Sequence, residues 1–556
     1  MHKSIEALVA RLPLDFRVLY RQFLLRVIDL EALSIQADVV GFLGQFAGVL
    51  IMLSIIHAFR IYLFLGVETW PIEQYLIATM MLVAGLIVVI SWDATFPDRR
   101  DAMVLSPLPV APHTILFAKI AASCAVLGLS ILALNVFSGL VCPLLLGAQH
   151  GTTLGRIQSF AAYWFTMAAA SAFLYCSVLT AQGLTALLLP RRLFLRLSAI
   201  LQLAAFGLFL GVYFVQGTIA TPAATADPAN QRLLAWSPSF WFFALFNQLN
   251  GSLPPQFSWL ASRAWAGLGT VAVGATLALI LCYVRTMKKT VEEPDLVPGA
   301  GGSHWAPNLG PPLQTALVLF SFRSLTRSRQ HRVLLAFYFS VVFAIALSLL
   351  RTVLSAPAPI LLSPDFYIPT LMMMSFAVFG LRSVFSLPIS LTANWVLRTT
   401  QLCSSERYVA ATRRTLLFLG VAPVWLVAAL LSLSFRPFHH VVAHLALLAL
   451  YGWILSELGL IGFHKVPFTC SYLPGKSNIQ LVFWGFLVVL LVVVMSIAEF
   501  EQRALHDPIL FVSMSSAFAA MASGLWAFNR HQAKSAVIYF EEVPDITIQT
   551  LGLQRD

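Results

Sequence analysis

Long apolar stretches alternate along the chain with short polar and charged connections. Each stretch has about 20 residues, the length that a helix needs to cross roughly 30 Å of hydrocarbon. A spanning segment must satisfy its backbone hydrogen bonds internally, so these stretches are predicted to be helices. The pattern predicts an all-α polytopic membrane protein with about twelve transmembrane helices in two six-helix halves. The predicted spans are 39–58, 75–92, 120–145, 160–189, 197–215 and 265–284, then 333–350, 367–391, 415–433, 441–463, 479–498 and 509–528.

An amphipathic basic segment precedes the first span of each half. Within 1–33, arginines such as Arg17 and Arg21 alternate with Phe16 and Phe23 at helical spacing, and 313–332 repeats this character. Such a helix lies in the interface, with its apolar face in lipid and its basic face toward the headgroups. Both segments are therefore predicted to lie along the membrane surface.

A stretch rich in Gly and Pro, residues 288–312, reads as a flexible cytoplasmic linker near the middle of the chain. It separates a first six-span half with its interfacial helix, 1–287, from a second six-span half, 313–530. A short cytoplasmic tail, 531–556, follows. Because both halves repeat the same order of surface helix, spans and inner loops, a parallel duplication is predicted.

Composition agrees with this pattern: 59% of the residues are hydrophobic and 11% are charged, which excludes a soluble enzyme. The formal net charge is +11, but most of the 35 Lys and Arg residues fall on the predicted inner side. This distribution predicts a plasma membrane protein of the bacterial inner membrane type, with both termini cytoplasmic. It also accounts for the positive charge, so no nucleic-acid partner is expected. The six cysteines form no CxxC pair, so neither a disulfide framework nor a metal cage is expected.

The inner loop between the second and third predicted spans, 93–119, combines a charged cluster, a short apolar turn and a Pro-rich bend. Asp98 and Asp101 flank Arg99 and Arg100, so two guanidinium groups already neutralise the carboxylates. A divalent metal site is therefore disfavoured. A protruding docking element on the cytoplasmic face is the favoured interpretation.

This loop resembles the inner loop of ATP-binding-cassette (ABC) exporter permeases of the second exporter type. The matching positions are Asp101, Leu105, Pro107, Leu108, Pro109, Ile115 and Lys119. In that family the loop contains a coupling helix that seats in a cleft of a cytosolic ATPase. The resemblance implies that 101–109 contacts such a subunit, two copies of which are expected.

At the corresponding place in the second half stand Arg398, Glu406 and Arg407, with no Pro-Leu-Pro element. The segment keeps an amphipathic character and a basic return to the membrane, so it is a second candidate for ATPase docking. Many permeases of the family assemble from two separate chains. The duplication suggests that this chain supplies both units.

The chain encodes no energy source of its own. Residues 470–477 end in Gly-Lys-Ser, but Cys470 stands where a phosphate-binding loop needs its first Gly. We expect no catalytic residue and no cofactor in this chain, and the resemblance implies that ATP and Mg²⁺ bind in the partner ATPase.

Two ionisable residues within predicted spans, Arg382 and Glu457, are candidates for a functional role because an intramembrane charge is costly. They are expected to pair with each other, or Arg382 to extend toward the interface; an anion site at Arg382 and a proton site at Glu457 are the alternatives. His439, His440 and His444 stand at the outer end of span ten. With no neighbouring carboxylate or Cys in the sequence, a metal site is not favoured there.

Three functions are compatible with these features. The first is the permease subunit of an ABC exporter, which is coupled to a separate ATPase. The sequence does not indicate which substrate is exported. The second is an ion-coupled secondary transporter, which also has twelve spans in two halves; few intramembrane carboxylates weigh against it. The third is a transferase acting on lipid-linked substrate, for which Glu68 and Glu73 in the first outer loop are the candidate acids.

Overall fold

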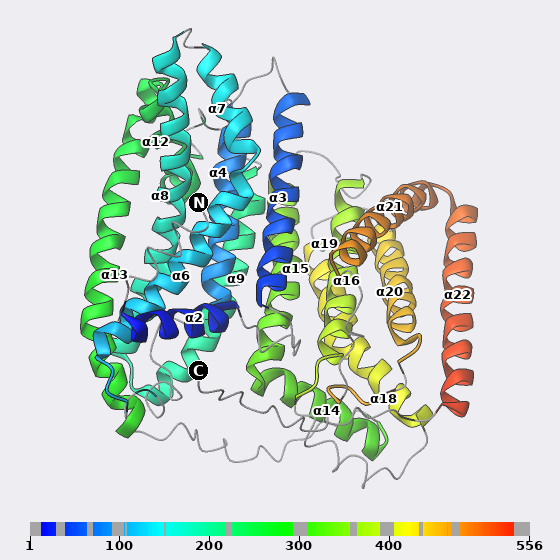
Figure 1. Cartoon of the computed structure of the whole chain (residues 1–556). Coiled ribbons are helices and arrows are strands. Elements are labelled where there is room, and N and C mark those ends of the chain that lie inside the picture. Colours follow the sequence, from blue (N-terminus) through cyan, green and yellow to red (C-terminus); the bar gives the residue numbers. More distant parts are fainter. Residues whose placement is uncertain are drawn as a thin grey trace. The chain divides into compact units, whose positions relative to one another are not determined.

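The computed structural model describes most of the chain, and its regular secondary structure there is helical throughout (Figure 1). No strand occurs among the described residues. These are 13–28, 39–63, 70–91, 105, 108–149, 152–217, 225, 227, 230–292, 310–355, 364–389, 405–432, 438–463, 465–469, 479–536 and 538.

The chain divides into two compact units, and the first comprises 1–303 with 343–351. Its long helix α8 packs against α4, α7, α12 and α13, while α2 lies across the lower part of α6 (Figure 1). The helices of unit 1 are α2 (Leu14–Ile28), α3 (Val39–Leu63), α4 (Trp70–Ile90), α6 (Pro112–Asn135), α7 (Ser138–Gln149), α8 (Thr153–Leu188), α9 (Arg191–Gly217), α11 (Gln231–Trp236), α12 (Pro238–Asn250), η3 (Pro255–Phe257) and α13 (Ser258–Glu292).

The second unit comprises 304–342 and 352–556. Helix α16 packs against α19, α20 and α21, and α20 packs against α22. The helices that begin in unit 2 are α14 (Pro312–Arg327), α15 (Arg329–Ser355), α16 (Pro364–Phe385), α18 (Ser405–Leu416), η6 (Leu417–Val421), α19 (Ala422–Ser432), α20 (Phe438–Leu460), α21 (Ile479–His506) and α22 (Pro508–Ser535).

Nine helices in the described part of the chain are long and apolar enough to cross a membrane. Two shorter apolar helices, 46–62 and 200–216, coincide with further predicted spans. The protein is therefore a helical membrane protein, and the count of twelve spans stays a prediction. The third predicted span, 120–145, is interrupted: α6 ends at Asn135 and α7 begins at Ser138.

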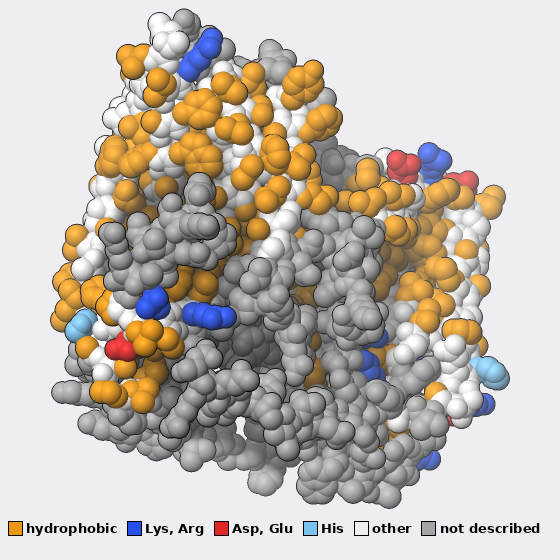
Figure 2. Space-filling model, in the orientation of Figure 1, with side chains coloured by type: hydrophobic (Ala, Val, Ile, Leu, Met, Phe, Trp, Pro, Cys, Tyr) orange, Lys and Arg blue, Asp and Glu red, His pale blue; other side chains and the backbone are white. Residues whose placement is uncertain are grey.

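Helices α13 and α22 expose most of their apolar surface, as a helix that faces lipid does. Only 17% of the apolar stretch of α13 and 6% of that of α22 is buried within the protein. Figure 2 shows apolar side chains spread over the described outer faces of both units. An exposed surface of this kind would drive aggregation in water but costs nothing in hydrocarbon.

An aromatic-rich segment, 236–246, packs into unit 1. Helix α12 contacts α4, α8 and α13 and buries Phe240, Phe242 and Phe246. Trp236, just before it, is 85% exposed, at the position expected for an interfacial anchor. Gly251 ends α12 with φ 78°, a left-handed conformation that glycine adopts without strain.

A π-helical turn, η6, joins α18 to α19 within one candidate span, 405–432. Gly420 in this turn lies close to Val378 of α16, so its missing side chain permits the close approach of the two helices. π-Turns inside helices are rare and are found preferentially at functional sites. This turn begins one helical turn beyond Arg413, the residue that pairs with Glu457 in unit 2.

Candidate functional site

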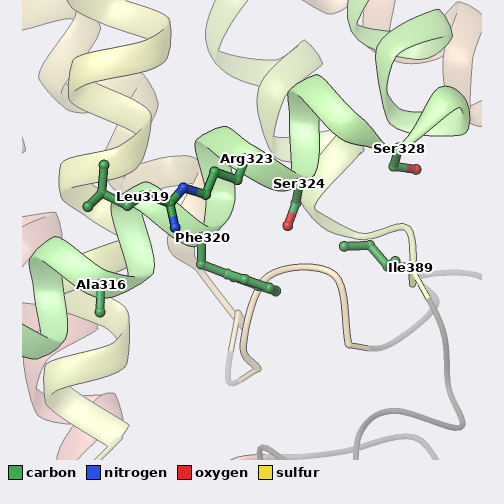
Figure 3. Close-up of a pocket in the computed structure, with 7 residues that line it drawn as sticks. All are labelled: Ala316, Leu319, Phe320, Arg323, Ser324, Ser328 and Ile389. Carbon is green, nitrogen blue, oxygen red and sulfur yellow. The ribbon is translucent and has the colours of Figure 1, made fainter. Parts of the chain in front are cut away.

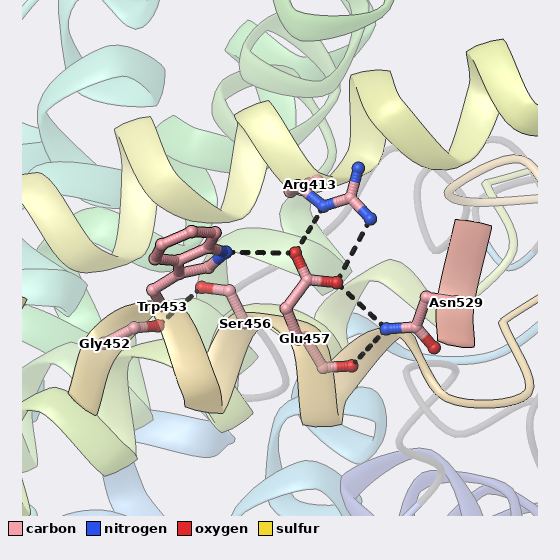
Figure 4. A network of polar contacts seen from close by, with 6 residues as sticks. All are labelled: Arg413, Gly452, Trp453, Ser456, Glu457 and Asn529. Atoms are coloured by element: carbon pink, nitrogen blue, oxygen red, sulfur yellow. Dashed lines mark hydrogen bonds and ion pairs between the residues drawn. The ribbon is translucent and has the colours of Figure 1, made fainter. Parts of the chain in front are cut away.

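The most highly connected buried charge of unit 2 is Glu457, whose side chain is fully buried on α20 (Figure 4). Arg413 of α18 binds it through two hydrogen bonds, Nε to Oε1 at 2.5 Å and Nη2 to Oε2 at 3.1 Å. Trp453 Nε1 donates to Oε1 at 3.3 Å. Asn529 Nδ2 of α22 donates to Oε2 at 2.9 Å and to the backbone oxygen of Glu457 at 2.8 Å. One carboxylate thus connects three helices.

The predicted pairing of Glu457 with Arg382 is wrong, because Arg413 takes that place. The two arginines are hard to distinguish in the sequence: Arg413 stands only two residues before the predicted start of span nine. In the structure the helix begins at Ser405, and this places Arg413 beside α20. A bidentate guanidinium pair is the geometry that best offsets the cost of burying a carboxylate.

Arg382 instead uses its side chain to bind the backbone of α20. Its Nε donates to the carbonyl oxygen of Gly459 at 2.5 Å, its Nη1 donates to Ser386, and its guanidinium lies 4.3 Å from the ring centroid of Phe463. Ser386 is one turn farther along the chain than Arg382, so the side chain extends toward the end of α16, as a snorkelling arginine does. The guanidinium of Arg382 thus lies against the carbonyl oxygen of Gly459 and links α16 to α20.

A second buried pair lies between His444 of α20 and Glu501 of α21. His444 Nδ1 and Glu501 Oε1 are 2.6 Å apart, and the two side chains are 0% and 1% exposed. The rings of Phe366 and Tyr367 of α16 both lie 5.3 Å from the imidazole. His444 Nε2 is buried without a hydrogen-bond partner among the described residues. The pair is therefore a buried imidazole and carboxylate in hydrogen-bond contact, flanked by two aromatic rings.

The sequence-based reading of this region missed Glu501. The prediction ended span eleven at residue 498 and assigned Glu501 to an outer loop, whereas α21 continues to His506. His444 therefore does have a neighbouring carboxylate. In the part of the chain that the structure describes, no group of three or more His, Cys, Asp or Glu residues could hold a metal ion. The structure thus adds a carboxylate partner for His444 that the sequence did not indicate.

Neutral side chains dominate the best-defined polar network of unit 1. Tyr163 donates to Asn135 Oδ1 at 2.8 Å and contacts Ser138 at 3.4 Å, and Ser138 contacts Ser54 at 3.4 Å. These residues come from α8, α6, α7 and α3 and are all buried. The network satisfies the polar groups where α6 gives way to α7, and it holds four helices without a net charge.

The predicted position of Glu73 in an outer loop is wrong. It lies in the first turn of α4, is 6% exposed, and accepts a hydrogen bond from Asn247 of α12 at 3.2 Å. It lines a small cavity with Tyr163 and Thr166 whose volume of about 10 Å³ is near the lower bound for one water molecule. A lipid-linked substrate has no access to such a cavity, and Glu68 lies outside the described residues.

The predicted docking loop of unit 1 is described in part. Asp98, Arg99, Arg100, Asp101 and Pro107 lie outside the described residues. Leu105 is half-buried and packs with the cluster around Leu19 and Phe23 of α2. Leu108 and Pro109 are exposed, with Leu108 at 48%. Lys119, by contrast, is 1% exposed, and its Nζ lies 5.2 Å from the ring centroid of Phe23.

Two of the three residues predicted for docking in the second half lie on a helix. Glu406 and Arg407 lie in the first turn of α18, where Arg407 is exposed. Glu406 accepts a hydrogen bond at 2.6 Å from Nε of Arg530 on α22. Arg398 lies outside the described residues, as does the stretch 470–477 that ends in Gly-Lys-Ser.

A groove of about 780 Å³ runs beside α14 in unit 2 (Figure 3). Its walls are mostly apolar, with Leu319, Phe320 and Ile389, and Arg323 is the one charged residue among the described residues that line it. Phe320 stacks edge-on against Phe468, a residue held at φ 68°, which is uncommon for a bulky side chain. The groove suits an apolar chain better than a charged ligand.

No family model, no curated protein and no solved structure matches this chain.

Proposed function

We propose that the protein is the membrane-spanning permease subunit of an ABC-type exporter, in which a separate cytosolic ATPase supplies the energy. In this proposal it resides in the bacterial inner membrane with both termini in the cytoplasm. Two ATPase copies bind ATP and Mg²⁺, and this chain forms the path for the substrate. The proposal does not specify which substrate is exported. The chain itself does no catalysis; it works by changing conformation.

The end of the docking loop is the observation that carries this proposal. Leu105 packs against the crosswise helix α2, and Leu108 and Pro109, three and four residues farther on, face outward. Helix α6 begins directly afterwards, at Pro112. A force applied at Leu108 would therefore reach both α2 and α6. An exposed apolar residue on an anchored bend is also what a protein partner needs as a contact.

Co-purification with an ATP-binding partner tests the proposal. Tagged protein is isolated from its native membranes, and co-purified subunits are photolabelled with 8-azido-ATP and assayed for ATP hydrolysis. Leu108→Asp places a charge at the exposed contact, and we expect it to lose the labelled subunit. Leu154→Asp is the control, since Leu154 is 74% exposed at the beginning of α8, far along the chain from the docking loop.

The proposal fails if the wild type brings down no ATP-labelled subunit, or if Leu108→Asp retains that subunit as well as Leu154→Asp does. Leu105→Asp is less informative, because Leu105 is half-buried against α2 and its substitution disturbs the fold.

The buried pair His444 and Glu501 favours a second candidate, an ion-coupled secondary transporter. The scarcity of intramembrane carboxylates weighed against that function, and the structure adds Glu501 to Glu457 as a fully buried carboxylate. Buried histidines and carboxylates form the proton relays of many pumps and transporters, and in this protein the two groups lie 2.6 Å apart.

A proton jump across reconstituted membranes distinguishes the two candidates without knowledge of the substrate. Proteoliposomes on a solid-supported membrane are stepped from about pH 7.5 to about pH 5.5, the range in which histidine titrates. The ion-coupled candidate predicts a transient current that Glu501→Gln abolishes. The exporter candidate predicts no current that depends on Glu501.

A further inference from the structure

A polar pocket of about 260 Å³ lies in unit 2, where α14, α18 and α22 meet. Three arginines line it: Arg413 and Arg414 of α18 and Arg530 of α22. Glu406 is the one carboxylate among the described residues that line it. Glu457 lies just behind Arg413 and neutralises a second positive charge. Among the described residues of this region, the arginines outnumber the carboxylates.

Donors in this pocket exceed the acceptors that the protein supplies. Arg413 uses Nε and Nη2 on Glu457, and Nη1 has no partner among the described residues. Arg530 uses Nε on Glu406, and its two terminal nitrogens are likewise without a partner there. Oε1 of Gln314 is buried without a hydrogen bond. Together these groups present several N–H donors and one acceptor to the same space.

The residues around the pocket are of the types that gather at a membrane interface. Helix α14 is one of the two amphipathic basic segments of the chain, and Trp526 lines the pocket from α22, whose apolar stretch is almost entirely exposed. The Arg530 guanidinium lies 5.3 Å from the centroid of the Trp526 ring. Tryptophan and arginine gather at the membrane interface, and the exposed face of α22 gives acyl chains access to the pocket.

We propose that this pocket binds the headgroup of an anionic phospholipid whose headgroup carries hydroxyls, as phosphatidylglycerol does. The phosphodiester accepts hydrogen bonds from the terminal nitrogens of Arg530 and from Nη1 of Arg413, and a glycerol hydroxyl donates to Gln314 Oε1. The acyl chains lie along the apolar face of α22. This assignment is independent of how transport is energised, since it concerns the lipid environment of unit 2 alone.

Native mass spectrometry of the full-length protein in detergent tests the assignment. Dioleoylphosphatidylglycerol and dioleoylphosphatidylcholine are titrated separately, and inorganic phosphate is added as a competitor in a third arm. We expect tighter binding of the anionic lipid. Arg530→Gln should weaken it about tenfold, because charge-assisted hydrogen bonds to the phosphate are lost. Arg530→Lys should weaken it less.

Arg503→Gln is the matched control. Arg503 is exposed on α21 and lies 5.9 Å from the ring of Phe500 on its own helix, as Arg530 lies over Trp526, but it does not line the pocket. Arg503→Gln should bind the anionic lipid as the wild type does. Arg530 is 47% exposed, so its exchange leaves the fold intact.

Three outcomes would overturn the assignment. The first is equal binding of the two lipids by the wild type. The second is an equal loss in Arg503→Gln and Arg530→Gln, which would indicate a general effect of surface charge. The third is full displacement of the lipid by inorganic phosphate, which would assign the pocket to a soluble anion.

Discussion

The interiors of the two units solve the problem of buried polarity differently. In unit 1, Tyr163, Asn135, Ser138 and Ser54 form a chain of neutral hydrogen-bonding groups across four helices. In unit 2, the fully buried Glu457 is held by the guanidinium of Arg413. A second buried carboxylate, Glu501, pairs with His444. Unit 1 also buries Glu73, which accepts a hydrogen bond from Asn247, and Lys119, which lies near the ring of Phe23. The contrast therefore lies in how these two networks are built and not in whether a unit buries charge.

This difference has a physical consequence. Neutral hydrogen bonds contribute modestly and do not depend on pH, whereas a buried ion pair is costly to break because the remaining charge is left without compensation. Buried charges also respond to protonation and to the membrane potential. The two buried pairs of unit 2 are therefore candidates for an electrostatic change of state, and a π-turn begins one helical turn after Arg413.

The largest expected effect comes from breaking the ion pair of unit 2. Arg413→Gln leaves Glu457 buried without its cation and should lower the free energy of unfolding by about 3–5 kcal/mol. Unfolding of the purified protein by a denaturing detergent, followed by tryptophan fluorescence, measures this loss.

The double variant Arg413→Gln with Glu457→Gln is the control for that experiment. It removes both charges, so much of the lost stability should return. If the double variant is as unstable as Arg413→Gln, the effect comes from packing and the electrostatic contrast between the units is wrong.

A smaller effect is expected at His331, at the beginning of α15 and outside the candidate span of that helix. Burial holds its pKa below the usual value for histidine, although the hydrogen bond with the Leu387 carbonyl at 2.9 Å acts in the opposite direction. The unfolded chain therefore binds the proton more readily. Stability should fall as the pH drops below about 6.5, by up to about 1 kcal/mol per pH unit.

His331→Asn removes this titration, so its unfolding free energy should fall less than that of the wild type between about pH 7.5 and about pH 5.5. His531→Asn changes an exposed histidine of α22 and serves as the comparison. A wild-type pH profile that His331→Asn leaves unchanged would contradict the role of burial at this site.

The smallest effect is expected in the neutral network of unit 1. Tyr163→Phe removes the hydrogen bond to Asn135 Oδ1 and should cost about 1 kcal/mol, with no dependence on pH. Tyr62→Phe, at a residue 65% exposed, should change little. A loss in Tyr163→Phe as large as that in Arg413→Gln would remove the distinction between the two interiors.

The apolar periodicity predicted the helices well, because every predicted span overlaps helical structure, although the third is divided between α6 and α7. It predicted helix ends less well. Three extra residues of α21 beyond 498 bring in Glu501, and an earlier beginning of α18 brings in Arg413. Charged residues at the ends of apolar stretches read as loop residues, since hydropathy does not show that a partner on another helix compensates their charge.

The sequence by itself determined that this is a helical membrane protein, while the duplication of two six-span halves stays a prediction. These properties follow from the length of apolar runs and from the burial of backbone hydrogen bonds, which are local. Only the tertiary structure decided that Glu457 pairs with Arg413 and not with Arg382, and that His444 meets Glu501. It also decided which arginines share a pocket with Gln314. Such contacts join residues from different helices, and their choice depends on how those helices pack.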